Sequence, residues 1–152
     1  MSSSGVAEAR SRVEFRVGVA DPLGYCCALL RSATAKGART VVCVPQALLE
    51  ALDQRLWTFS PLDFLAHCRA GEALEARSPI VLCSEPDVHS LGDRDCLVNL
   101  GVDGVRGWES LPRVIELVGD DAAGKASARR RFRMYRDAGC EPQTLEVGHD
   151  TR

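Results

Sequence analysis

The sequence predicts a three-layer α/β protein, with a mostly parallel sheet and helices on both faces. Three observations indicate this class. Short apolar segments alternate with amphipathic ones along most of the chain, as in successive βαβ units. The 152 residues suit one domain with its own core. The composition, 45% hydrophobic and 26% charged, is ordinary for a soluble globular protein.

The charge balance excludes some classes of protein. Nineteen basic and 21 acidic residues give a formal net charge of −2. A protein that grips nucleic acid with its whole surface should be basic, so the balance argues against that class. No apolar run approaches the roughly 18 residues that span a bilayer, and charges among the first twenty residues argue against a secretory signal. We therefore expect a cytoplasmic protein with no membrane contact.

The first elements are a tail, a strand and a helix. Residues 1–11 are small and polar, and we predict a flexible tail followed by a single domain over residues 12–148. Residues 13–19 alternate apolar and polar side chains, which predicts a strand with one buried face. Asp21 and Pro22 then mark the start of a helix.

A second strand and helix follow. The continuous apolar run at residues 40–44 is rich in β-branched side chains, which predicts a strand buried on both faces. Pro45 opens a helix whose inward face is expected to consist of Leu48, Leu49, Leu52 and Leu56. Residues 57–77 show no regular period, and we predict an irregular segment there.

The second half of the chain repeats the alternation. Short apolar runs at residues 80–83, 96–100 and 114–118 predict three more strands. A helix is expected over residues 121–138 and a closing strand over residues 144–147. Strands joined by helices in this order favour a largely parallel sheet.

The seven cysteines indicate buried, reduced thiols. Most have apolar neighbours, and the sequence contains neither Cys-x-x-Cys nor Cys/His pairs with zinc spacing. A thiol nucleophile would need a nearby base, and the three histidines are scattered along the chain. We therefore expect no metal and no cofactor, with a Cys–His enzyme as a minor alternative.

Residues 119–126, Gly-Asp-Asp-Ala-Ala-Gly-Lys-Ala, follow a predicted strand and open a helix, which is the setting of a phosphate-binding P-loop. The segment departs from that motif twice. Ala126 replaces the hydroxyl residue that would reach Mg²⁺. Asp120 and Asp121 place carboxylates where backbone N–H groups would hold phosphates, and both suit a helix N-terminus instead. A nucleotide-binding enzyme stays open as an alternative.

The last predicted helix concentrates positive charge beside an apolar stripe. Six cations and no acid occur between Lys125 and Arg136. Helical spacing groups the apolar residues Ala128, Phe132 and Tyr135, and beside them the cations Lys125, Arg129, Arg133 and Arg136. This face is either solvated or a site for an acidic partner. Arginine favours carboxylate and phosphate, so an acidic peptide with a hydrophobic end and nucleic acid both stay open.

A second candidate surface lies at residues 56–65, which hold three of the eight aromatic residues. The segment is either folded onto the sheet or exposed as a partner site with Trp57 as its anchor. Docking one tryptophan contributes about 4–6 kcal/mol at most, against roughly 0.2–1 kcal/mol for an exposed ion pair. We expect this surface to hold the tighter partner.

Three blocks of residues carry a resemblance to a known family. The first is Leu56-Trp57 with residues 64–72, the second is residues 97–100, and the third joins residues 113–118 to residues 128–139. Their order and spacing, within residues 13–147, resemble the chi subunit family of bacterial DNA polymerase III. The resemblance implies a Rossmann-like fold without nucleotide chemistry and a non-catalytic accessory subunit of the clamp-loader assembly.

The resemblance also implies partners and site residues. It assigns Trp57 and Phe64 to binding of the psi subunit, which tethers the chain to the loader. It assigns Lys125, Arg129, Phe132 and Arg133 to the acidic, phenylalanine-ended tail of the single-stranded-DNA-binding protein. DNA would be reached only indirectly. An XPD-type helicase is a further implied partner, in competition with psi.

Overall fold

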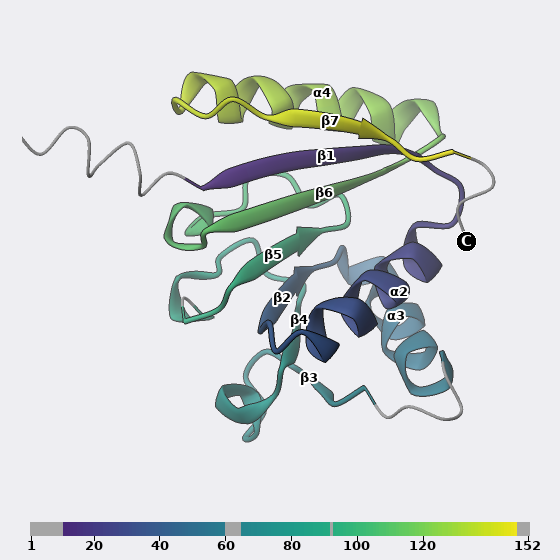
Figure 1. Cartoon of the computed structure of the whole chain (residues 1–152), viewed down its shortest axis with the longest axis vertical. Coiled ribbons are helices and arrows are strands. Elements are labelled where there is room, and N and C mark those ends of the chain that lie inside the picture. Colours follow the sequence, from purple (N-terminus) through teal and green to yellow (C-terminus); the bar gives the residue numbers. More distant parts are fainter. Residues whose placement is uncertain (1–10, 60–64, 92, 149–152) are drawn as a thin grey trace, which may run out of the picture.

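The computed structural model describes residues 11–59, 65–91 and 93–148, which form a seven-stranded sheet with helices on both faces (Figure 1). The strands are β1 (Arg12–Val19), β2 (Thr40–Cys43), β3 (His67–Arg69), β4 (Ile80–Cys83), β5 (Cys96–Asn99), β6 (Arg113–Gly119) and β7 (Gln143–Glu146). The α-helices of the described ranges are α2 (Pro22–Ala35), α3 (Gln46–Thr58) and α4 (Ala122–Asp137). The predicted three-layer, Rossmann-like α/β class is confirmed.

The strand order is β3-β4-β2-β5-β6-β1-β7, and each neighbouring pair is parallel. From β1 the chain runs through α2 to β2, toward one edge of the sheet, whereas from β6 it runs through α4 to β7, toward the other. Because crossovers between parallel strands are right-handed, the two directions place α2 and α4 on opposite faces. Strands β3 and β7 form the two edges.

The core is divided between the two faces of the sheet. In β2, Val42 contributes to the cluster that also contains Leu30 of α2 and Leu52 of α3. Its neighbour Val41 contributes to the opposite cluster, with Tyr135 of α4. Adjacent strand residues point to opposite faces, so a strand covered on both sides is apolar throughout, as predicted for residues 40–44.

The helix starts follow the sequence signals. The Asp21 carboxylate accepts a hydrogen bond from the Gly24 backbone N–H at 3.3 Å and caps α2. The Asp121 carboxylate accepts from the Gly124 N–H at 2.9 Å and caps α4. After α4, Gly139 has a φ of 98°, a left-handed conformation that glycine adopts without steric cost.

Two expectations about α3 and its surroundings are wrong. Leu48 is 39% exposed, because at 100° per residue it lies about 70° from the centre of the stripe formed by Leu49, Leu52 and Leu56. Residues 57–77 are not wholly irregular, since they contain the end of α3, the strand β3 and a 3₁₀ turn at Glu75–Arg77. Three residues of β3 are too few to show a period in the sequence.

The described chain begins at Ser11, which we assigned to the tail. Ser11 is buried, and its hydroxyl donates to the Leu111 carbonyl oxygen. Residues 1–10 and 149–152 lie outside the described residues. Within the described ranges, each helix falls short of the length and apolar character that crossing a bilayer demands.

Candidate functional site

Aromatic packing holds α4 against the sheet. The ring of Phe132 lies 5.2 Å from that of Phe15 on β1, and the ring of Tyr135 lies 4.9 Å from that of Trp108 in an edge-on contact. Ala128 and Tyr135 are buried. The apolar stripe predicted for this helix therefore faces inward.

A buried ionic network fixes α4 further. The fully buried Glu116 carboxylate of β6 accepts hydrogen bonds from Arg131 Nε at 2.9 Å, Tyr135 Oη at 2.7 Å and Asn99 Nδ2 at 3.0 Å. Burial raises the pKa of Glu116 above its ordinary value, against the lowering effect of the Arg131 charge. Burial and the Glu116 charge also raise the pKa of Tyr135. A buried ion pair is costly to break, so this network sets the position of the helix.

Two of the six α4 cations are neutralised within the chain. Asp103 accepts from Arg131 Nη1 at 2.9 Å and from Arg130 Nη2 at 3.1 Å. Burial opposes ionisation of Asp103, but the hydrogen bonds from Arg131, Ser127 and Arg130 lower its pKa overall. Of the three consecutive arginines Arg129, Arg130 and Arg131, two are therefore neutralised by a carboxylate of the same chain.

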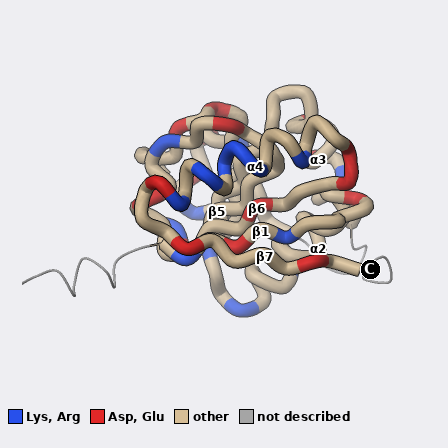
Figure 2. Tube along the Cα trace, turned by 90° about the horizontal axis from the view of Figure 1, so that it is seen from above, with Lys and Arg blue, Asp and Glu red and all other residues tan. Residues whose placement is uncertain are grey.

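The remaining four α4 cations are exposed. Figure 2 shows basic residues in blue along α4. Among the residues that the structure describes, no carboxylate lies within ion-pair distance of any of these four cations. They are Lys125, Arg129, Arg133 and Arg136. These charges are available to an outside partner.

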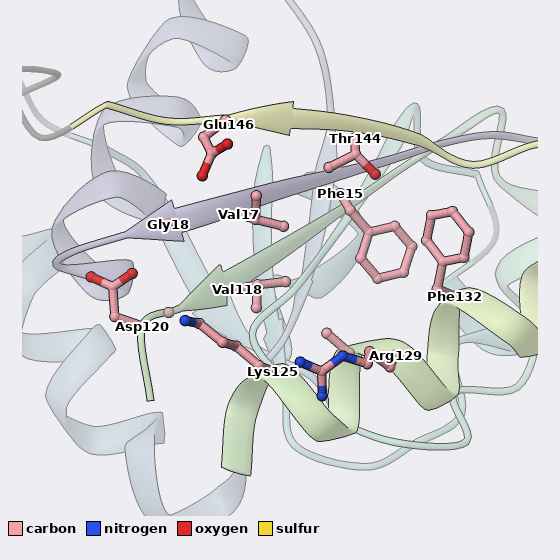
Figure 3. A pocket seen from close by; sticks show the side chains of 12 residues that line it. Phe15, Val17, Gly18, Val118, Asp120, Lys125, Arg129, Phe132, Thr144 and Glu146 are labelled. Carbon is pink, nitrogen blue, oxygen red and sulfur yellow. The ribbon is translucent and has the colours of Figure 1, made fainter. Parts of the chain in front are cut away.

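A cleft of about 330 Å³ lies between α4 and the strands β1, β6 and β7 (Figure 3). We call it the α4 cleft. Its apolar lining is formed by Phe15, Val17, Val118, Ala128 and Phe132. Two cations from α4, Lys125 and Arg129, and two carboxylates, Asp120 and Glu146, complete its charged lining.

The structure brings together three of the four residues assigned to the acidic tail. Lys125, Arg129 and Phe132 line the α4 cleft. Arg133 does not line it and is exposed one turn further along the helix. Sequence reasoning missed the opposite wall, because Phe15 and Thr144 become neighbours only through the parallel pairing of β1 with β7.

Trp57 lies near the end of α3 and is 54% exposed. Its indole packs on the ring of His67, with centroids 4.7 Å apart. The His67 side chain is only 1% exposed, with Nε2 2.7 Å from Asp53 Oδ1 and Nδ1 2.9 Å from the Leu65 carbonyl oxygen. Trp57 is thus an exposed aromatic side chain that packs on the buried ring of His67. Phe64, assigned to the same surface, lies outside the described residues.

Ion pairs between Arg69 of β3 and two carboxylates of α3 join these elements beside Trp57. Asp53 Oδ2 accepts from Arg69 Nε and Nη2 at 3.0 and 2.8 Å, and Glu50 Oε1 accepts from Arg69 Nη2 at 2.9 Å. Burial opposes ionisation of Asp53, but hydrogen bonds from His67 and Arg69 lower its pKa overall. Helical spacing places Glu50, Asp53 and Trp57 on one face of α3. We call the surface formed by Glu50, Asp53, Trp57, His67 and Arg69 the Trp57 surface.

The near-P-loop segment is a helix cap. The Asp121 carboxylate occupies the Gly124 N–H, and a Cβ atom on Gly124 would lie 2.9 Å from Asp121 Oδ1. Sheets of this class bind ligands where crossovers diverge in opposite directions, here between β1 and β6. A Cβ atom on Gly119 would lie 3.4 Å from Pro22 Cγ, so the start of α2 closes on the end of β6. This packing does not support a phosphate site.

The thiols are structural. None of the seven cysteines, all of which lie in the described ranges, forms a disulfide, and six of them are buried. Burial raises the pKa of Cys27 and Cys96 to about 11, so these thiols stay protonated at neutral pH. Over the described ranges, no group of three or more His, Cys, Asp or Glu side chains is arranged to hold a metal ion.

Comparisons with known proteins agree with the resemblance. The chain matches the family described as DNA polymerase III chi subunit, HolC, over residues 11–143. It is 35% identical over 134 residues to DNA polymerase III subunit chi of Pseudomonas aeruginosa strain PAO1, which covers 85% of this chain and 92% of that protein. It is 32% identical over 123 residues to the protein of the same name in Haemophilus influenzae strain Rd, covering 80% and 85%. The chain belongs to the chi subunit family of DNA polymerase III.

Proposed function

We propose that this chain is a non-catalytic accessory subunit of the bacterial DNA polymerase III holoenzyme. In this role it bridges the psi subunit and the acidic C-terminal tail of the single-stranded-DNA-binding protein during DNA replication. The observation that carries the proposal is the α4 cleft, where an aromatic floor lies beside cations that have no ion-pair partner among the described residues. Membership of the chi family supports it.

The chemistry of the α4 cleft suits a tail that ends in phenylalanine. The terminal side chain would pack against Phe15 and Phe132, whose tilted rings already offer the geometry that aromatic groups favour. Carboxylates of the tail would accept hydrogen bonds from Lys125 and Arg129. Arg133, outside the cleft, would meet an acidic residue further upstream in the tail.

The Trp57 surface suits the psi subunit for a different reason. Its charged side chains are already paired with one another, so the indole is the group with most to gain from contact. A half-exposed tryptophan on a rigid support is a typical anchor of a protein interface. Burying its exposed half contributes about 2–3 kcal/mol by area.

The topology supports simultaneous binding of both partners. The α4 cleft lies along β7, and the Trp57 surface lies along β3. These strands are the opposite edges of the sheet (Figure 1). A partner at one edge leaves the other edge accessible, as a bridging subunit requires.

A titration of the full chain with a peptide copying the acidic tail tests the proposal. Arg129→Ala combined with Arg133→Ala is expected to weaken binding greatly and leave the circular dichroism spectrum and melting temperature unchanged. Arg12→Ala combined with Arg77→Ala is the matched control, since both are exposed and lie away from the cleft. Equal affinities for the two double variants would contradict the proposal.

Titrations with nucleotides and with single-stranded DNA distinguish the two alternative functions. Binding of ATP or GTP with Mg²⁺, abolished by Lys125→Ala, would favour a nucleotide-binding enzyme. Binding of single-stranded DNA in the absence of the peptide, with an affinity that falls steeply as the salt concentration rises, would favour a nucleic-acid-binding module. We expect neither, because the helix cap occupies the loop and half of the charged side chains lining the α4 cleft are carboxylates.

A further inference from the structure

We propose that Asp120 and Glu146 determine the specificity of the α4 cleft by fixing the direction in which an acidic peptide lies in it. The cleft then accepts a peptide whose acidic residues leave toward Arg133 and Arg136, and it rejects chains that carry negative charge throughout, such as nucleic acid. This inference rests on the proposed function, because it takes an acidic peptide as the ligand of the cleft.

The two ends of the cleft are chemically different (Figure 3). Because the strands are parallel, their carboxyl ends meet at one side of the sheet, where Glu146 pairs in register with Val17 and Asp120 follows the last residue of β6. Two residues back along the strands, Thr144 pairs with Phe15, which lies against Phe132. One end of the cleft therefore holds two carboxylates beside Lys125, and the other end is aromatic.

The charges that line the cleft are not neutralised by pairing. Among the described residues, neither Asp120 nor Glu146 lies within ion-pair distance of Lys125, Arg129 or any other cation. Asp103, by contrast, forms ion pairs with Arg130 and Arg131 of the same helix. Two cations and two carboxylates thus line the same cleft without forming an ion pair with one another among the described residues.

This arrangement fixes how an acidic peptide can lie. A carboxylate bound by Lys125 and Arg129 is attracted there, but a second one extending past Lys125 would meet Asp120 and Glu146 and be repelled. In the other direction the helix continues with the exposed Arg133 and Arg136. The peptide's further acidic residues are therefore expected along the carboxyl-terminal half of α4.

The same carboxylates discriminate against nucleic acid. A phosphate chain carries one charge at each nucleotide and cannot present an uncharged stretch to the acidic end of the cleft. A peptide can, because its negative charges are confined to its acidic side chains and its terminus. Discrimination of this kind works by repelling the wrong partner rather than by binding the right one more tightly.

The test uses the full chain and two probes, the acidic tail peptide and single-stranded oligo(dT). Asp120→Asn combined with Glu146→Gln is expected to bind the peptide about 2- to 5-fold more tightly for each carboxylate removed at low salt. The double variant should also bind oligo(dT) measurably, which the unmodified chain should not. Glu85→Gln combined with Glu109→Gln removes the same charge from exposed positions outside the cleft and should change neither affinity.

The outcomes separate the two proposals. If the unmodified chain binds the peptide and the cleft variant behaves like the control variant toward both probes, the directional role of Asp120 and Glu146 is overturned while the proposed function stands. If the unmodified chain does not bind the peptide, the proposed function fails and this inference fails with it. A third measurement checks direction: Arg136→Glu should weaken a peptide with upstream acids and leave unchanged one whose upstream acids are replaced by amides.

Discussion

Around Trp57, the polar side chains Glu50, Asp53, His67 and Arg69 contact one another. In the α4 cleft, Lys125, Arg129, Asp120 and Glu146 line one space without forming an ion pair among the described residues. A partner at the Trp57 surface would mainly cover the apolar indole of Trp57. A partner in the α4 cleft would instead supply charges opposite to those of Lys125 and Arg129. The difference indicates how each interaction should respond to salt, pH and mutation, because apolar burial and exposed ion pairs respond differently.

The largest expected effect separates arginines within one helix. Arg131→Ala should lower the free energy of unfolding by about 3–5 kcal/mol, because it leaves Glu116 buried without its cation. Arg129→Ala should leave unfolding nearly unchanged and weaken binding of the acidic peptide. Urea denaturation and peptide titration of both variants measure the contrast. A large stability loss for Arg129→Ala would show that the two arginines do not differ as the structure indicates.

The next effect concerns the Trp57 surface. Trp57→Ala should weaken psi binding by about 2–3 kcal/mol, the value for the exposed half of an indole, and spare the acidic peptide. Calorimetric titration with purified psi measures it, and Leu74→Ala, which truncates a 64% exposed leucine elsewhere, is the control. Loss of both partners in Trp57→Ala would indicate misfolding instead.

Salt should distinguish the surfaces without any mutation. Raising the ionic strength from about 0.05 to 0.5 M shortens the screening distance severalfold, which should weaken peptide binding about tenfold and leave psi binding nearly constant. Both titrations can be run in the same buffers on the unmodified chain. Parallel salt dependences would contradict the assignment of apolar contact to one surface and ionic contact to the other.

The smallest effect is on acid stability. Since the pKa of Asp53 is lowered in the folded chain, its ionised form contributes stability that is complete above the ordinary aspartate pKa and is lost as the pH falls through the lowered value. Between about pH 5 and pH 2, Asp53→Asn should therefore lose less stability than the unmodified chain. Asp120→Asn, which removes a carboxylate outside this network, is the matched control. Thermal melts across this range measure the slopes.

Much of the fold could be predicted because most elements carry their own signals. The apolar run at residues 40–44 and the aspartate caps of α2 and α4 are local features, and the structure confirms them. The strand β3 could not be recognised, because it is three residues long and is stabilised by pairing with β4 and by the Asp53–Arg69 contact. Its existence depends on residues distant in the sequence.

Of the α4 cleft, only the side formed by α4 could be predicted from the sequence. The helical period of α4 grouped Lys125, Arg129 and Phe132, which line the cleft. It could not show that Arg131, in the middle of the same run, is paired with the buried Glu116. Nor could it show the opposite wall, because pairing between β1 and β7 brings together residues more than a hundred positions apart.

The seven-stranded sheet also fixes the distance between the two surfaces. With neighbouring strands about 4.8 Å apart, its two edge strands are separated by about 29 Å. This exceeds the roughly 8 Å over which charges interact at physiological salt, so occupancy of one edge should not alter the affinity of the other. The domain then acts as a passive spacer. Any gain in overall affinity would arise from tethering, as a raised effective concentration of one partner near the other.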